Sequence, residues 1–167
     1  MSSCVELNDS MKNFLNKLAI EGKLRIVQPS EEISTAYISK SHSNLNAAKI
    51  LLDSAQLEEC VTLAYYAMYN CVLALLFRCG IKSENHGASI IILKKIFGEP
   101  KLESMISFGK KERIDKQYYI DFSLTKKDSD DMLIMAEEFI IQCQIVINKL
   151  THTRIDEIRL KLAEELR

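Results

Sequence analysis

The segment from Cys60 to Phe77 is eighteen residues long and carries no formal charge. This length lies at the lower limit for a helix that crosses a bilayer. Thr62, Asn70 and three tyrosines are spread through its middle, whereas the tyrosines of a membrane helix gather at its two ends. We therefore expect no membrane span, but a central helix that neighbouring helices or a second protomer cover on all sides.

Helix signals on both sides of this segment predict an all-α fold. Ser30, followed by two glutamates, predicts the start of a helix that ends near Ser54. The central helix should run from Leu57 to Arg78 and end at Gly80, since glycine readily takes the left-handed conformation there. The chain has only 5 Gly and 2 Pro and shows no strand-like alternation. We expect a helical bundle around a tightly connected antiparallel pair.

The other elements have weaker signals. We expect a short helix over Glu6–Leu18 and another that begins with Ser83 or His86 as its cap. Residues 102–108 predict a helical turn, and we expect the polar stretch 109–127 to form an ordered loop that its aromatic residues hold in place.

The C-terminal third contains the clearest helical period of the chain. Thr125 and Asp128 have the spacing of a capping box, and the apolar stripe that follows continues to Leu150. Beyond Thr151 a thinner apolar stripe lies among many charges. This tail is either the end of the long helix or a separate docking helix.

Composition places few limits on the function. The net charge of −1 gives no general argument for nucleic acid or an anionic membrane. Nine basic and five acidic residues lie between Arg78 and Lys116, which fits a solvated face or an RNA contact. The five cysteines form no CxxC pair, and the N-terminus is charged where a signal peptide is apolar. We expect reduced thiols in a cytoplasmic protein.

The strongest candidate for chemistry is the pair Arg78 and His86, at the junction of two predicted helices. A histidine can act as acid or base near neutral pH, and a guanidinium can hold a phosphate. Together they suit metal-free RNA cleavage, in which the ribose 2′-hydroxyl attacks the adjacent phosphate. Alternatively, Arg78 neutralises a helix C-terminus and His86 caps the next helix. The three histidines lie far apart in sequence, so we expect no metal site and no cofactor.

Four further residues are candidates for substrate binding. Lys82 and Asn85 lie between the arginine and the histidine, and Arg113 and Tyr118 lie in the polar stretch before the last long helix. The alternative for Arg113 and Tyr118 is an ion pair and an aromatic lid that anchor this stretch.

Three segments of the chain resemble the HEPN domain, a small helical domain. They read SHSNLNAAKILLDS, then AYYAMYNCVLALLFRCG with SENHGASIIILKKIF, and finally RIDKQYYIDFSLTKKDSDDMLIMAEEFIIQCQIVI. The resemblance implies an up-and-down bundle of four or five helices over residues 31–150, commonly dimeric through the central helices. Residues 1–30 would form an N-terminal helical extension, and residues 151–167 a helical tail.

The resemblance also implies two possible functions. Many HEPN proteins are metal-independent ribonucleases, often toxins paired with a minimal nucleotidyltransferase antitoxin, whose arginine and histidine meet across the dimer. Others are non-catalytic modules that bind nucleotides or proteins. His86 matches the family histidine and Arg78 the family arginine, but seven residues separate the two here, against four to six in active members. We expect a toxin–antitoxin-like or RNA-processing protein, with the binding module as the alternative.

Overall fold

The computed structural model describes residues 8–118 and 124–166, with only the backbone for residues 115–118. Within these residues the chain forms seven helices and two short strands. Their order is α1 (Asp9–Ile20), β1 (Leu24–Ile26), α2 (Glu31–Asp53), α3 (Leu57–Arg78), β2 (Ile81–Ser83), α4 (His86–Lys95), α5 (Pro100–Tyr118), α6 (Lys126–Asn148) and α7 (His152–Glu165).

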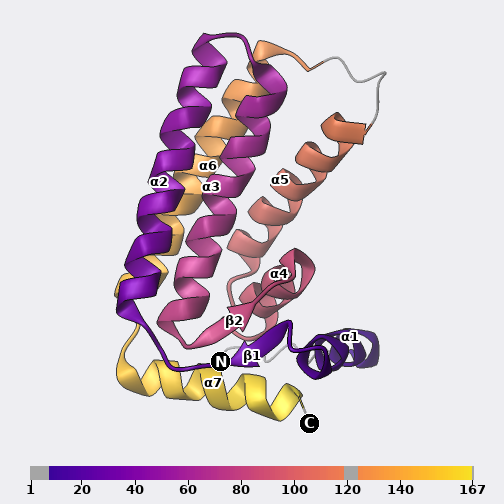
Figure 1. Ribbon diagram of the computed structural model, residues 1–167, viewed down its shortest axis with the longest axis vertical. Coiled ribbons are helices and arrows are strands. Elements are labelled where there is room, and N and C mark those ends of the chain that lie inside the picture. The colour runs from indigo at the N-terminus through magenta and orange to yellow at the C-terminus, as the bar shows by residue number, and fades with distance from the viewer. Residues whose placement is uncertain (1–7, 119–123, 167) are drawn as a thin grey trace.

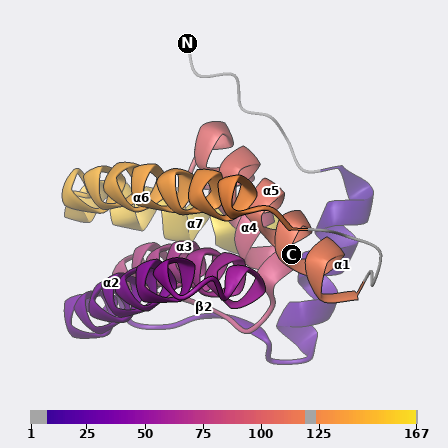
Figure 2. The same cartoon turned by 90° about the horizontal axis from the view of Figure 1, so that it is seen from above.

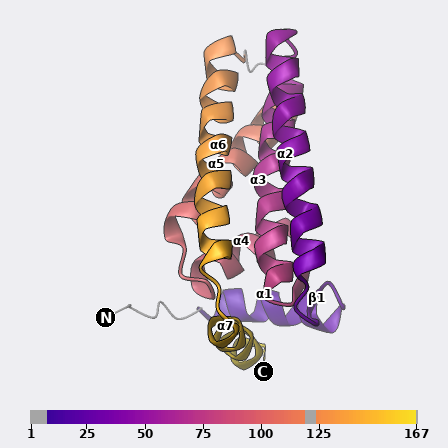
Figure 3. The ribbon, with the colours of Figure 1, turned by 90° about the vertical axis from the view of Figure 1, so that its left-hand side faces the viewer.

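The long helices form an up-and-down bundle, which confirms the predicted all-α fold. Helices α2, α3 and α6 run side by side, and α5 lies along the open side of α3 (Figures 1 and 3). Seen from above, α6 and the α2–α3 pair form two rows, and α1 stands to one side of them (Figure 2). The short helix α4 sits below α5, and α1, β1 and α7 lie across the lower end of the bundle (Figure 1).

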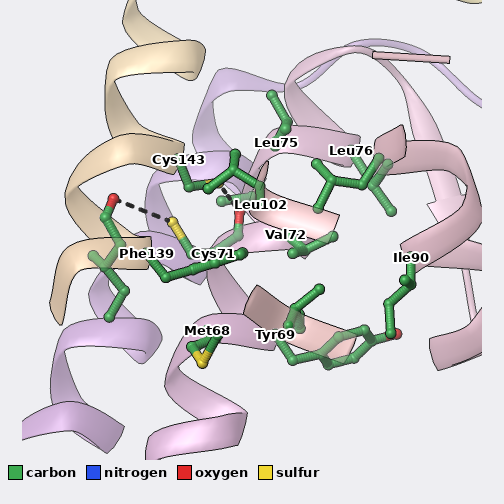
Figure 4. Packing of buried hydrophobic residues seen from close by; sticks show 14 of the residues in the cluster. Met68, Tyr69, Cys71, Val72, Leu75, Leu76, Ile90, Leu102, Phe139 and Cys143 are labelled. Atoms are coloured by element: carbon green, nitrogen blue, oxygen red, sulfur yellow. Dashed lines mark hydrogen bonds between the residues drawn. The ribbon is translucent and has the colours of Figure 1, made fainter. Parts of the chain in front are cut away.

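Helix α3 is the core of the protein. It is long and apolar enough to cross a membrane, but 72% of its apolar window is buried inside the protein, as in the core helix of a bundle. Met68, Cys71, Val72 and Leu75 pack against α6 and α5 (Figure 4). The thiol of Cys71 donates to the carbonyl of Ile140, 3.9 Å away, which links α3 to α6. Burial by its neighbours therefore accounts for the uncharged stretch.

The local signals for three helices are confirmed. The hydroxyl of Ser30 accepts a hydrogen bond from the backbone N–H of Ile33 at 3.1 Å, and α2 begins at the next residue. The capping box of Thr125 and Asp128 is complete. Gly80, just beyond the end of α3, has a φ of +68°, the left-handed conformation that favours glycine.

Two boundaries differ from the predictions. The cap of α4 is Asn85, whose side chain accepts from the N–H of Ala88 at 3.0 Å, so neither Ser83 nor His86 caps it. Helix α1 is capped by Asn8 and begins at Asp9, and the predicted start at Glu6 lies outside the described residues.

The predicted loop over residues 109–127 is wrong for its first half, because α5 continues to Tyr118. Gly109 stands in the middle of this helix, at its approach to α3 and α6. A Cβ on Gly109 would lie 2.9 Å from Cε of Met132 and 3.4 Å from Sδ of Met68. The glycine permits close packing between helices here and does not end the helix.

The structure also contains a strand pair that the sequence did not predict. β1 and β2 have three residues each and pair antiparallel, with Leu24 opposite Ser83 and Ile26 opposite Ile81. Strands this short show no alternation to detect. They join the N-terminal segment to the turn that precedes α4.

The C-terminal tail is a separate helix, which decides between the two alternatives. Thr151 caps α7, and α7 crosses beneath the bundle (Figure 3). The Arg159 guanidinium donates to the carbonyl oxygens of Val27 at 2.6 Å and of Cys79 and Gly80 at 3.2 Å each. One side chain thus fastens α7 to the end of α3 and to the segment after β1.

The expectation of reduced thiols holds for the four cysteines in the described residues. Cys60, Cys71, Cys79 and Cys143 are all buried and free. Burial raises the pKa of the Cys79 thiol to about 12 and that of Cys60 to about 11. These side chains act as small apolar groups of the core.

Candidate functional site

His86 is the first residue of α4, and its imidazole lies against α3. The hydroxyl of Tyr65 lies 2.6 Å from Nδ1 of His86. The ring of Tyr69, one helical turn further along α3, stacks on the imidazole with centroids 3.7 Å apart and an interplanar angle of 16°. The ring of Tyr66 meets the imidazole edge-on. Three tyrosines therefore hold the histidine in one orientation.

A chain of hydroxyl groups supports the turn that carries His86. The hydroxyl of Tyr69 lies 3.3 Å from Oγ of Ser89, and Ser89 Oγ lies 3.0 Å from both Oγ of Ser83 and the carbonyl oxygen of Asn85. Ser83 and Ser89 are buried. Because buried polar groups that are all paired make a rigid network, the end of β2 and the start of α4 are fixed relative to α3.

Helix α5 brings two cations to the same place. Nη1 of Arg113 donates to the hydroxyl of Tyr66 at 2.8 Å, and its guanidinium carbon lies 5.2 Å from the centre of the Tyr65 ring. Nε of Arg113 is buried and has no hydrogen-bond partner among the described residues. Burial, with the positive charges of Arg113 and Lys110, lowers the pKa of His86 to about 4. The imidazole is therefore neutral at pH 7.

These side chains surround a polar pocket of about 310 Å³, which we call the His86 pocket. It is lined by Tyr66, Glu84, Asn85, His86, Gly87, Lys110 and Arg113. The only carboxylate among these residues belongs to Glu84. It is 2.9 Å from Lys82 and 3.8 Å from Arg25, and the hydrogen bond from Lys82 lowers its pKa. With the charge of Glu84 balanced outside the pocket, Lys110 and Arg113 make the pocket attractive to an anion.

A comparison with protein-family models identifies the chain. The model described as the HEPN domain matches residues 34–146. The chain belongs to the HEPN domain family. A search of curated proteins finds no match.

The HEPN match covers the whole candidate site but not every element that packs near it. Every residue that lines the His86 pocket lies within the matched region, as do nearly all of α2 and all of α3 to α5. Helix α1, β1 and α7 lie outside it. Two of these elements still support the site, because β1 pairs with β2, and Phe14 of α1 lies near Gly87.

The structure brings some of the predicted site residues of this HEPN protein together. Asn85, His86 and Arg113 line one pocket, and Lys82 does not line it but forms an ion pair with Glu84, which does. The side chain of Tyr118 lies outside the described residues.

Arg78 lies away from the His86 pocket. It is nine residues beyond Tyr69 on α3, a rise of roughly 13 Å along the helix. Its Nη1 lies 3.3 Å from a carboxylate oxygen of Glu31, and it does not line the His86 pocket. Within one chain, therefore, the cations that face His86 are Lys110 and Arg113.

Lys110, Tyr65 and Tyr69 are not among the residues that the sequence predicts for the site. A signal for the tyrosines existed, since residues four apart share a face of a helix. The same spacing rule applies to Lys110 and Arg113, three residues apart, but it could not be used while their segment was expected to be a loop.

A second pocket of about 420 Å³ lies where α2 ends and α3 begins, and we call it the α2–α3 pocket. It is lined by Leu51, Glu58, Glu59, Val61, Thr62, Leu63 and Arg113. Among the described residues, no group of three or more His, Cys, Asp or Glu side chains is placed to hold a metal ion.

Proposed function

We propose that this HEPN protein binds RNA through a phosphate in the His86 pocket and cleaves it without a metal ion. The observation that carries the proposal is the fixed imidazole of His86 opposite Lys110 and Arg113 in a polar pocket of about 310 Å³. A guanidinium and an ammonium are the side chains that bind phosphate most readily. The family resemblance supports the same class of substrate.

The cleavage step needs one proton acceptor and stabilisation of the phosphate. When Nδ1–H of His86 donates to the hydroxyl of Tyr65, Nε2 has a free electron pair and can take the proton of the ribose 2′-hydroxyl. The 2′-oxygen then forms a bond to phosphorus while the bond to the 5′-oxygen breaks. The 5′-oxygen takes a proton from water, the hydroxide that forms takes the proton from His86, and a 2′,3′-cyclic phosphate remains. Arg113 and Lys110 stabilise the additional negative charge.

The low pKa of His86 makes its imidazole a weak base in the free protein, and a bound phosphate raises this pKa. The pKa is lowered by burial and by two cations. A phosphate group between the imidazole and these cations favours the imidazolium, so the pKa rises when RNA binds. Binding of the substrate therefore makes His86 a stronger base.

The second candidate function is non-catalytic binding of a nucleotide. It is favoured by the neutral state of His86 in the free protein and by the place of Arg78, which pairs with Glu31 instead of lining the pocket. In this case His86 donates Nε2–H to the phosphate while Nδ1 accepts from Tyr65.

Cleavage of a defined RNA in chelator distinguishes the two. We expect the wild type to cut, His86→Gln to lose at least a hundredfold in rate, and Arg113→Lys to lose roughly tenfold. His42→Gln is the matched control, because His42 lies on α2 and bonds Gln144. Binding of RNA or nucleotides without cleavage would support the second candidate. Equal cutting by wild type and His86→Gln would overturn the enzyme proposal.

The proposed assembly is a homodimer through the central helices, paired with a nucleotidyltransferase-type antitoxin. In a dimer, Arg78 of the partner subunit would complete the site. If this is right, His86→Gln and Arg78→Ala proteins are each inactive, and a mixture of the two recovers activity because one of the two sites in a mixed dimer is intact. Sedimentation at several concentrations tests the dimer, and copurification with a nucleotidyltransferase encoded nearby tests the partner.

A further inference from the structure

The side chain of Arg113 belongs to two pockets at once. It lines the His86 pocket and also the α2–α3 pocket, about 420 Å³ in volume, at the N-terminal end of α3. Its Nη1 is bonded to Tyr66, while its buried Nε has no hydrogen-bond partner among the described residues. An unpaired buried donor is costly, and a ligand that accepts from it removes that cost. A phosphate bound at Arg113 therefore lies beside both spaces.

The α2–α3 pocket has the chemistry of a site for a flat polar ring. Leu51, Val61 and Leu63 supply an apolar lining, and Glu58 and Glu59 supply carboxylates from the first turn of α3. Among the described residues neither carboxylate forms an ion pair, and ionised carboxylates only accept hydrogen bonds. Both glutamates are exposed, so the carboxylates stand at the solvent side of the apolar lining. A ligand that lays an apolar ring against this lining would complement them with hydrogen-bond donors at its edge.

Guanine meets this requirement better than the other bases. Its N1–H and N2–H₂ lie next to each other on one edge and match the two oxygens of a carboxylate. Adenine and cytosine place a ring nitrogen acceptor beside their amino group, and uracil places its N3–H between two carbonyl oxygens. These acceptors face a carboxylate unfavourably, so the other three bases should bind less tightly than guanine.

We propose that the α2–α3 pocket binds a guanine base whose phosphate lies at Arg113, so that the protein prefers guanosine nucleotides and guanosine-containing sites in RNA. This inference rests on the proposed function for the phosphate position, and it adds the base. Single-stranded RNA is recognised in this way in other proteins, through the Watson–Crick edge of an unstacked base.

Titration calorimetry with GMP, AMP, UMP and inorganic phosphate tests the proposal. We expect GMP to bind at least tenfold more tightly than UMP, AMP or phosphate. The double variant Glu58→Gln/Glu59→Gln should lose this preference and still bind phosphate. Glu32→Gln is the control, because Glu32 is an exposed glutamate in the first turn of α2, at the opposite end of the bundle. Arg113→Lys should weaken the binding of every nucleotide.

The outcomes separate the two proposals. Equal binding of all four ligands, or a preference for guanine that survives in the Glu58→Gln/Glu59→Gln variant, overturns the guanine pocket and leaves the phosphate site intact. Failure of the wild type to bind GMP or phosphate overturns both. Circular dichroism of each variant confirms that a loss of binding does not come from unfolding.

Discussion

The hydroxyl of Tyr65 and Nδ1 of His86 lie 2.6 Å apart, across the contact between α3 and the first residue of α4. Tyr65 is fully buried, and burial raises its pKa, so the phenol keeps its proton at neutral pH. A protonated phenol and a neutral imidazole can share this hydrogen bond near pH 7. This bond selects which imidazole nitrogen faces the pocket, and it is the contact on which both proposed functions depend.

Removal of the hydrogen bond between Tyr65 and His86 should allow both tautomers of the imidazole. In Tyr65→Phe we expect the 15N spectrum of His86 to change from one tautomer to a mixture, because Nδ1 no longer has a fixed partner. The free energy of unfolding should fall by about 1 kcal/mol. Tyr37→Phe serves as the control, since Tyr37 stacks on Phe77 away from the histidine. A single unchanged tautomer in Tyr65→Phe would show that the tyrosine does not orient the ring.

Stability should depend on pH through His86. Its pKa is about 4 in the folded protein and 6.5 ordinarily, so between these values the unfolded chain binds more protons and stability rises with pH. The contribution is complete above pH 6.5 and is lost as the pH falls toward 4. For this half-buried group we expect on the order of 1–3 kcal/mol.

Urea unfolding of the wild type and of His86→Gln at pH 7 and pH 4.5 measures this effect. The carboxylates titrate in both proteins, so the difference between the two pH dependences isolates the histidine. Parallel pH dependences would contradict the prediction.

Gly80 should not tolerate a side chain. Its φ of +68° strains any other residue, and an added Cβ would overlap Nη1 of Arg159 and the carbonyl oxygen of Val27. We expect Gly80→Ala to cost about 2–4 kcal/mol in unfolding free energy. Gly22→Ala is matched in φ, at +71°, but has open space, so it should cost only about 1–2 kcal/mol. Equal losses would mean that the contact with Arg159 is unimportant.

Arg159 should be a larger source of stability than other surface arginines. Its guanidinium satisfies the carbonyls of Val27, Cys79 and Gly80, and Ala at this position leaves them without that donor. Arg159→Ala should cost about 2–3 kcal/mol. Arg154 pairs with exposed Glu157 on the same helix, and Arg154→Ala should stay within about 0.5 kcal/mol. Thermal unfolding of the two variants side by side gives the comparison.

The local parts of the fold were predictable from sequence. Ser30, the Thr125–Asp128 box and Gly80 marked the ends of α2, α6 and α3, because caps depend on residues only a few positions apart. The uncharged run from Cys60 to Phe77 required a helix buried on all sides, and the bundle followed from that.

The site was predictable only in part. His86 was recognised from its place at a helix start and from the family resemblance, and Asn85 and Arg113 were named with it. The sequence does not show which cations lie near His86. Arg113 is 27 positions away in the chain (113 − 86), and it lines the same pocket because α5 remains helical through Gly109. Arg78, closer in sequence, pairs with Glu31 instead.

Sequence alone determined that this chain is a helical bundle with a histidine at the start of a helix, because period and capping are properties of neighbouring residues. Tertiary structure decided which cations face that histidine, that α7 turns beneath the bundle, and that two three-residue strands pair. These features arise from contacts between residues far apart in the chain. Such contacts depend on how closely helices approach one another, and no local pattern encodes that distance.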